Sequence, residues 1–390
     1  MIRFAHIADC HLGGWRQPEI QALNSKAFEK AVDSCISEKL NFVLITGDLF
    51  DNAMPSIDVL KSAANKLREL KENNIPCYII AGSHDYSASG KTFLDVLEKA
   101  GLCENIEKIN EDTLGITEKE NFILAGISGK KGELEKELIK KIKVPKLGNK
   151  LKILALHTTI DGLASDFMKG IKIDELPKGF DYYALGHIHK PFKKEIGKSV
   201  LAYPGPLFPN NFAELEELEN GGFLIVKYDG KRIETEKYEV RMKNIFFVKI
   251  DATGKYPEII TSEIIQKIKH ENVKDKIIMI KISGTLLRGK TSDINFREIE
   301  EEAKRANCYS LMRNTSGLES PEFIIKTELK SENVDEIEKE VISKQKSDDF
   351  SKFTELLIKS MEIEKLEGEK TETFEKRLFE EFSKVFGVEL

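Results

Sequence analysis

The 390-residue sequence is poor in cysteine and has no long apolar run. The few cysteines are scattered, with no Cys-x-x-Cys pair, at positions Cys10, Cys35, Cys77, Cys103 and Cys308. This distribution argues against a disulfide framework and against a thiolate zinc site. No apolar run approaches the roughly 18 residues that span a bilayer, and His6 and Asp9 stand where a signal peptide would be apolar. We therefore expect a cytoplasmic protein with reduced thiols and no membrane partner.

The sequence also lacks an excess of basic charge. Its 60 Lys and Arg residues and 66 Asp and Glu residues give a formal net charge of −6. Nucleic-acid binding would therefore depend on a local patch or on bound metal. Residues 331–390 contain 17 acidic and 10 basic residues and carry a net charge of −7, which leaves a net charge of +1 for residues 1–330.

A hydrophobic content of 41% is enough for a core in each of the roughly two to three domains that this length predicts.

Short β-branched runs alternate with helical patterns from residue 1 to about residue 240, which indicates a layered α/β domain. The expected strands are 2–8, 42–46, 77–81, 122–127, 151–157 and 182–185. The expected helices lie near 20–39, 56–72, 90–100 and 132–142. A hairpin over 221–239, with its turn at Asp229-Gly230, closes the domain. Ligands gather where the strands of such sheets end, so function should be sought there.

Two further units follow. Residues 241–330 have a β-α-β-α-β order and contain His270 as their one histidine, so no catalytic role is assigned to them. The tail, residues 331–390, contains two stretches with apolar residues at helical spacing, separated by a charged break at 364–373. Four phenylalanines between residues 374 and 386 are more apolar area than an isolated helix can bury. These faces dock either on the protein's own body or in a groove of another chain.

Histidine and aspartate recur at the ends of five predicted strands. The five groups, in chain order, are Asp9-Cys10-His11, Gly47-Asp48, Gly82-Ser83-His84-Asp85, His157 and Gly186-His187-Ile188-His189. A single such group is more often a turn or cap than a metal site. Five such groups, each at the end of a predicted strand, are unlikely to occur by chance and indicate a metal site. His6 and His270 stand outside the set.

The residue types suit a pair of divalent transition-metal ions. Such a pair needs a carboxylate that can bridge, plus imidazole and carboxylate ligands on each ion, and Mn²⁺, Fe²⁺ and Zn²⁺ accept these ligands. Asp9 and His11 are two residues apart, as are His187 and His189, so in extended geometry each pair points the same way. Asp48 is the natural bridge.

The series of motifs resembles the calcineurin-like metallophosphoesterase superfamily, and within it the SbcD/Mre-type double-strand-break-repair nucleases. The resemblance rests on HIADCHLGG (6–14), ITGDLFDNAMPS (45–56), AGSHD (81–85), HTTIDG (157–162), ALGHIHKP (184–191) and YPGP (203–206). It implies a four-layer α/β fold, two sheets flanked by helices, over residues 1–240. It further implies a small α/β DNA-capping domain at 241–330, and a linker and helix-loop-helix at 331–390.

The family pattern implies a role for each site residue. One metal would be held by Asp9, His11, Asp48 and His189, and the other by Asp48, Ser83, His157 and His187. The cofactors would be two Mn²⁺ per chain, with Fe²⁺, Zn²⁺ or Mg²⁺ as alternatives. His84 resembles the family's catalytic histidine, which contacts the scissile phosphate and can protonate the leaving oxygen.

Three positions near the motifs carry separate expectations. Ser83 stands where the family usually has Asn, and its hydroxyl is a poorer ligand, so the second ion is expected to be held more weakly or through water. Asp85 either orients a neighbouring histidine or acts as a turn or cap residue. Asp51 stands where some relatives have a histidine, which leaves the balance of exonuclease to endonuclease action open.

Two surfaces suggest partners. Residues 130–152 contain nine lysines and three glutamates, which favours a solvated helix face over the alternative, a strip that tracks DNA phosphates. In the family, helices such as 56–72 and 90–100 form a homodimer. The family's helix-loop-helix grips an SbcC-type SMC-like coiled-coil ATPase, and the tail resembles it through Phe353, Leu357, Phe374, Leu378 and Phe382.

The sequence thus predicts a cytoplasmic or nucleoid-associated two-metal phosphodiesterase that acts on DNA ends in double-strand-break repair. By resemblance, its activities would be 3′-5′ exonuclease and single-strand endonuclease. A nucleotide or phosphoprotein metallophosphatase is one alternative, although such relatives rarely carry the second β-α-β unit and the amphipathic tail. A DNA-end-binding scaffold with catalysis weakened at Ser83 is the other.

Overall fold

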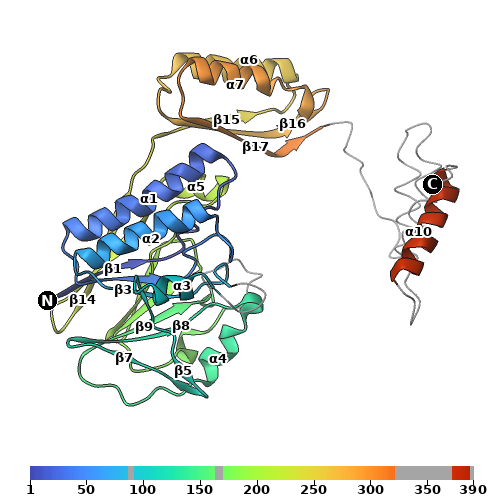
Figure 1. Ribbon diagram of the computed structural model, residues 1–390. Coiled ribbons are helices and arrows are strands. Elements are labelled where there is room, and N and C mark those ends of the chain that lie inside the picture. The colour runs from blue at the N-terminus through green and yellow to red at the C-terminus, as the bar shows by residue number, and fades with distance from the viewer. Residues whose placement is uncertain (87–91, 163–169, 321–370, 387–390) are drawn as a thin grey trace. The chain divides into compact units, whose positions relative to one another are not determined.

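The computed structural model describes residues 1–86, 92–162, 170–320 and 371–386 (Figure 1). Two six-stranded sheets form its centre. The first has the order β14-β13-β1-β2-β3-β4, with strands β1 (Ile2–Ile7), β2 (Phe42–Thr46), β3 (Cys77–Ile80), β4 (Glu104–Asn105), β13 (Gly221–Tyr228) and β14 (Ile233–Val240). The second has the order β11-β12-β10-β9-β8-β7, with strands β7 (Thr117–Glu118), β8 (Phe122–Ile127), β9 (Leu151–His157), β10 (Tyr182–Gly186), β11 (Phe192–Ile196) and β12 (Ser199–Tyr203).

The central strands of the first sheet, β1, β2 and β3, are mostly buried on both faces because each face packs against another layer. In β1, Phe4 belongs to the cluster between the two sheets, whereas Ala5 and Ile7 belong to the cluster under the helices. The same alternation runs along β2, where Phe42 faces the second sheet and stacks on Phe4 with ring centroids 4.5 Å apart. Strands covered on both sides lose the polar alternation of an exposed sheet, which is why these runs are continuously apolar.

Helices complete four layers. The first sheet is covered by helices whose buried residues join one apolar cluster: α1 (Pro18–Ser37), α2 (Ile57–Glu72), α3 (Leu94–Lys99) and α5 (Phe212–Leu218). Figure 1 shows α1 and α2 lying side by side over this sheet. The outer face of the second sheet packs against α4 (Glu135–Lys141) through Ile139. This arrangement confirms the expected four-layer α/β fold.

Most element bounds agree with the sequence-based expectations, and the exceptions have local causes. The expected helix at 132–142 begins only at Glu135, because Gly132, with a φ of 72°, lies in a short 3₁₀ turn, Lys131–Glu133, that precedes α4. Strand β11 was not predicted because it consists mostly of charged residues, and its neighbour β12 was missed as well. A minor two-stranded sheet, β5 (Ile109–Asn110) with β6 (Thr113–Leu114), was also missed. The hairpin β13–β14 is confirmed, with Gly230 at φ 100° in its turn.

The chain after β14 forms a three-stranded sheet with the order β15-β16-β17. Its elements are β15 (Ile245–Asp251), α6 (Pro257–His270), β16 (Ile277–Thr285), α7 (Phe296–Arg305) and β17 (Ser310–Glu319), which is the expected β-α-β-α-β order. Farther along the chain, residues Thr371–Phe386 form α10.

The chain divides into two compact units. The first comprises Met1–Ile250, Ser262–Ile282 and Phe296–Thr315, and the second Asp251–Thr261, Ser283–Asn295 and the chain from Ser316 onward. The functional division into residues 1–240, 241–330 and 331–390 stays a prediction. Among the described residues, no helix has the length and apolarity needed to cross a bilayer.

Candidate metal centre

The strand ends that carry the sequence motifs meet between the two sheets. β1 runs parallel to β2, β9 runs parallel to β10, and β2 contacts both β9 and β10. The pairing of the first two strands continues into their loops, where the backbone N–H of His11 donates to the carbonyl of Asp48 at 3.0 Å. The carboxyl ends of five predicted strands therefore supply side chains to one place.

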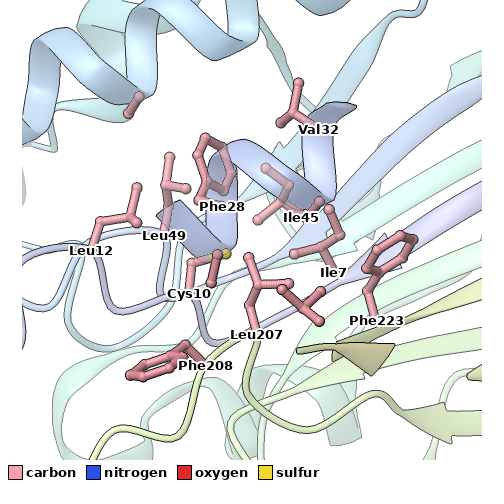
Figure 2. Packing of buried hydrophobic residues seen from close by; sticks show 14 of the residues in the cluster. Ile7, Cys10, Leu12, Phe28, Val32, Ile45, Leu49, Leu207, Phe208 and Phe223 are labelled. Carbon is pink, nitrogen blue, oxygen red and sulfur yellow. The ribbon is translucent and has the colours of Figure 1, made fainter. Parts of the chain in front are cut away.

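Apolar side chains anchor these loops to the core. Figure 2 shows Cys10, Leu12 and Leu49 in the same buried cluster as Ile7 and Phe28. Cys10 and Leu12 flank His11 in the chain, and Leu49 follows Asp48. Alternate loop residues thus pack into the core while the polar residues between them contribute to the site.

Four site residues have a left-handed backbone. The φ angles are 51° at Asp9, 43° at His11, 50° at Asp48 and 91° at His187. A non-glycine residue in this region is uncommon, and such conformations cluster where a site requires them. The backbone therefore turns sharply at the residues whose side chains meet.

The first donor group consists of Asp9, His11 and His189, whose ligand atoms all lie within 4.8 Å of one another. His189 Nδ1 lies 2.9 Å from a carboxylate oxygen of Glu214, and His11 Nδ1 lies 3.3 Å from Asp51 Oδ1. A proton on His189 Nδ1 satisfies Glu214 and leaves a lone pair on Nε2, whereas His11 Nδ1 is buried without a hydrogen-bond partner among the described residues. The Nε2 atoms of the two histidines are 3.1 Å apart, which suits a cation that both would bind.

The second donor group consists of Asp48, His157 and His187, again within 4.8 Å. His157 is buried, and its Nδ1 bonds to the carbonyl oxygen of Thr46 at 2.9 Å, which places its lone pair on Nε2. That Nε2 has no hydrogen-bond partner among the described residues and lies 3.2 Å from Asp48 Oδ2. A lone pair facing a carboxylate at this distance is stable only with a cation or a proton between them. The donor set fits a divalent metal.

Asp48 connects the two groups through one oxygen. Its Oδ2 lies 3.2 Å from His157 Nε2 and 3.7 Å from His11 Nε2, while Oδ1 accepts the backbone N–H of His84 at 2.8 Å. One carboxylate oxygen therefore faces both candidate cation positions. This is the arrangement expected of a bridging ligand in a two-metal site.

The electrostatics of the bare donor set favour positive charge. Burial opposes protonation of His157 and His189, but the carboxylates of Asp48, Asp9 and Glu214 raise the pKa of His157 to about 10 and that of His189 to about 9. Burial and the neighbouring His157 lower the pKa of His187 to about 4. Without a metal ion, the buried carboxylates attract protons to the imidazoles, so the site has a deficit of cationic charge.

His84 lies at the entrance of the site. Its Nδ1 lies 2.7 Å from the carbonyl oxygen of Asp51, and its exposed ring makes an edge contact with His11, with ring centroids 4.7 Å apart. His84 and Ser83 line a pocket of about 530 Å³ together with His187. His84 can also approach His11 and Asp48 within 4.8 Å, so geometry alone permits a ligand role as well.

The structure leaves little room beside two of the ligands. A Cβ added to Gly82 would lie 2.1 Å from Asp48 Oδ1, and one added to Gly47 would lie 2.2 Å from His157 Nδ1. Both contacts are far shorter than real carbon contacts allow. The glycines of the GD and AGSHD motifs are therefore required because the ligands pass directly over their backbone.

Comparison with known proteins agrees with this geometry. Residues 2–191 match the family model described as calcineurin-like phosphoesterase. Residues 2–191 therefore form a calcineurin-like phosphoesterase domain. Such a domain is typical of metal-dependent hydrolases of phosphoesters, and the donor groups described above lie within the matched residues.

Three curated relatives of this calcineurin-like phosphoesterase share one name, DNA double-strand break repair protein Mre11. The chain is 29% identical to the protein from Methanocaldococcus jannaschii, and the alignment covers 71% of this chain and 81% of that relative. It is 27% identical to the protein from Archaeoglobus fulgidus, and that alignment covers 85% of this chain and 77% of the relative. It is 28% identical to the protein from Sulfolobus acidocaldarius, where 85% of this chain and 87% of the relative are covered.

Asp85 makes its hydrogen bonds to backbone groups of the neighbouring loops. Its buried carboxylate accepts the backbone N–H groups of Leu49, Phe50 and Gly82 at 3.3, 3.0 and 2.9 Å. Burial and the nearby Asp48 raise the pKa of Asp85 to about 6. Among the described contacts it has no hydrogen bond to an imidazole, and its three backbone contacts are those of a turn or cap residue. A role of Asp85 in orienting a histidine stays a prediction. Asp85 fastens the Asp48 loop to the His84 loop.

Sequence reasoning missed the carboxylate that holds His189. Glu214 follows Asn211 by three residues, and the sequence pattern alone indicates only a helix cap. Asn211 does accept the backbone N–H of Glu214 at 2.9 Å, but the Glu214 side chain reaches His189. Likewise, the partner of His157 is a backbone carbonyl, which no residue type can signal.

The lysine-rich stretch of this phosphoesterase is largely neutralised by neighbouring carboxylates. Its ion-paired members are Lys136, Lys140, Lys141, Lys150 and Lys152, with N–O distances between 2.6 and 3.9 Å. Lys130 and Lys131 instead line the pocket beside His84. The pairing favours the solvated-face interpretation for most of the stretch and leaves two lysines next to the site.

The tail residues are only partly described. Phe353 and Leu357 lie outside the described residues, as does the side chain of Phe382. Phe374 and Leu378 lie on α10 and are half-buried, while Phe379 of the same helix is 60% exposed. A helix is thus present where the sequence predicted one, and its partner stays a prediction.

Proposed function

We propose that this calcineurin-like phosphoesterase is a manganese-dependent nuclease that hydrolyses phosphodiester bonds at DNA double-strand breaks. The single observation that carries the proposal is the pair of donor groups that share Asp48 Oδ2. The choice of DNA as substrate is supported by the shared name of the three relatives. By resemblance to the SbcD/Mre-type nucleases, the activities would be 3′-5′ exonuclease and single-strand endonuclease.

The proposed ligands follow the geometry. Asp9, His11 and His189 would hold one ion and His157 and His187 the other, with Asp48 between them. Two divalent ions held there would activate a water molecule and neutralise the charge that develops on the phosphoryl oxygens. Nitrogen and carboxylate ligands suit Mn²⁺, and also Fe²⁺ and Zn²⁺.

His84 is proposed as the proton donor to the leaving oxygen. Its Nδ1–H donates to the carbonyl of Asp51, which fixes the orientation of the ring. Nε2 is then the nitrogen that delivers the proton. Lys130 and Lys131 line the same pocket and would attract the phosphate backbone. Ser83 lies in this pocket as well, where its hydroxyl would complete the second ion's shell directly or through water.

The proposed partners are DNA ends, a second copy of the chain and an SbcC-type coiled-coil ATPase. The dimer would form through the region of α2 and α3, where Ile57 and Val96 are exposed at 76% and 53%. The ATPase would bind the tail, including α10. The proposed division of labour assigns hydrolysis to residues 1–240, DNA capping to 241–330 and ATPase binding to 331–390.

Metal-dependent DNA cleavage by wild-type and two variant proteins tests the proposal. His84→Ala should keep its bound Mn²⁺ and its DNA affinity but lose 10²- to 10⁴-fold in cleavage rate, because it removes only the proton donor. Asp48→Ala should lose metal and activity together, since the shared oxygen is gone. Metal content after purification without chelator is the second readout.

The assay also separates the alternatives. Wild-type protein that binds DNA ends and Mn²⁺ but does not cleave would support a scaffold in place of a nuclease. Cleavage of mononucleotides or phosphopeptides without cleavage of DNA would support a phosphatase. If His84→Ala empties the site of metal, His84 is a ligand and its proposed role is wrong.

A further inference from the structure

Glu214 makes contacts on both sides of its carboxylate. Oε1 faces His189 Nδ1 at 2.9 Å and also accepts the amide of Asn211 at 2.6 Å. Oε2 accepts the backbone N–H of Asn210 at 2.8 Å. One side chain, itself 19% exposed, thus fixes a histidine of the first donor group and the loop that precedes α5.

The Asn210 loop extends this path to His11. The side chain of Asn210 lies beside the carboxylate of Asp51 and, after His11, helps to lower the pKa of that carboxyl group. Asp51 Oδ1 in turn lies 3.3 Å from His11 Nδ1. Glu214 therefore reaches His189 directly and His11 through Asn210 and Asp51.

The second donor group does not depend on α5. His157 is oriented by the Thr46 carbonyl at 2.9 Å, and the backbone N–H of His187 donates to Asp9 at 3.0 Å. Neither contact involves Glu214 or the loop before it. The second donor group is thus oriented without Glu214, although it shares Asp48 with the first group and the backbone of its His187 bonds to Asp9.

We propose that Glu214 is a positioning residue that sets the affinity of one metal position, the one formed by Asp9, His11 and His189, and leaves the other nearly unchanged. This inference rests on the proposed two-metal function. Partners of this kind fix the tautomer and orientation of a ligating histidine, and their loss typically weakens metal binding 10- to 100-fold. An asymmetric loss is the distinctive expectation, because a general weakening of the fold would reduce both affinities.

The helix itself should tolerate the change. The cap is made by the Asn211 side chain to the backbone of residue 214, so Glu214→Ala retains it. Leu215 is buried in the apolar cluster and keeps α5 on the first sheet. Glu217, on the same helix, is exposed and forms only a surface pair with Lys190 at 3.8 Å, so Glu217→Ala is the matched control.

The test is calorimetric titration of Mn²⁺ into chelator-treated full-length protein, with the melting temperature recorded for each variant. Wild type and Glu217→Ala should show the same two binding constants. Glu214→Ala should lose 10- to 100-fold in one constant and less than about threefold in the other. Glu214→Gln, which keeps one acceptor oxygen, should lose less in the same constant and replaces the alanine variant if that variant melts early.

Two results would overturn the inference. Unchanged constants in Glu214→Ala would mean that His189 and His11 need no support from α5. An equal fall in both constants would mean that Glu214 supports the site as a whole. Wild-type protein that binds two ions but leaves DNA intact would refute only the proposed nuclease function, because the titration does not use DNA.

Discussion

His6 is the one histidine of the matched domain that lies away from the candidate metal centre, and it offers a test of the core beneath that centre. It is fully buried, with Nδ1 2.9 Å from the Tyr182 hydroxyl and Nε2 3.1 Å from Thr46 Oγ1. Burial lowers its pKa from 6.5 to about 3, only partly opposed by a backbone hydrogen bond to Leu185. The folded protein therefore keeps His6 neutral at pH values where an unfolded chain protonates it.

The sign of the pH effect follows from this difference. Between pH 6.5 and pH 3 the unfolded state binds a proton at His6 and the folded state does not, so stability falls as the pH falls through this window. From pH 7 to pH 5 the loss at this one residue is on the order of 2 kcal/mol. Above pH 7 it contributes almost nothing to the pH dependence.

Urea unfolding at pH 7 and pH 5 measures this loss. His6→Gln removes the titrating group while keeping an amide near Tyr182 and Thr46. The wild-type protein should lose about 2 kcal/mol of unfolding free energy at His6 between pH 7 and pH 5, and the variant should lack this part of the loss. His270→Gln, at an exposed position at the end of α6, is the control for removal of one histidine and should behave as wild type. Equal losses in wild type and His6→Gln would refute the reasoning.

Two other predictions concern the second ion and the tail. Ser83→Asn should supply an amide oxygen and lower the Mn²⁺ concentration for half-maximal cleavage, by up to about tenfold; an unchanged requirement would mean that the hydroxyl or a water already completes the shell. Truncation after residue 345 should leave a soluble Mn²⁺-dependent nuclease that no longer copurifies with its coiled-coil ATPase, because large apolar side chains such as Phe374 and Phe379 gain about 1.5 to 3 kcal/mol each on burial. Copurification at normal yield would exclude the tail as the ATPase-binding segment, and a lower melting temperature would indicate docking on the protein's own body.

The sequence was sufficient for the parts of the fold that local pattern determines. β2, β8 and β9 have the predicted bounds, because each is a continuous apolar run between polar turns. The donor groups were found for a related reason, since Asp9, His11 and Asp48 belong to short motifs directly after such runs. A strand end is a local feature, and the parallel register then brings several ends together.

The supporting contacts could not be predicted, because they join residues that are distant in sequence and ordinary in type. Glu214 belongs to an acidic helix, and nothing in FAELEEL distinguishes it from its glutamate neighbours. Asp51 acts on His84 through its carbonyl oxygen, which every residue possesses. The backbone partners of Asp85 were not predicted either, because a motif places a carboxylate near imidazoles without showing which way the loop turns.

The unusual backbone of the ligands explains why the residues between them are apolar. Left-handed conformations at non-glycine residues cost on the order of 1 to 3 kcal/mol each, and Asp9, His11 and Asp48 all adopt them. Burial of a large apolar side chain contributes about 1.5 to 3 kcal/mol, and Leu12 and Leu49 are at most 3% exposed. Each ligand with a left-handed backbone is therefore adjacent to a side chain whose burial offsets the cost of that conformation. The Asp85 carboxylate, which accepts backbone N–H groups from both loops, holds the Asp48 loop against the His84 loop. Each motif consequently combines a buried apolar residue with a metal-donor residue next to it, so a change at the apolar position should displace the donor.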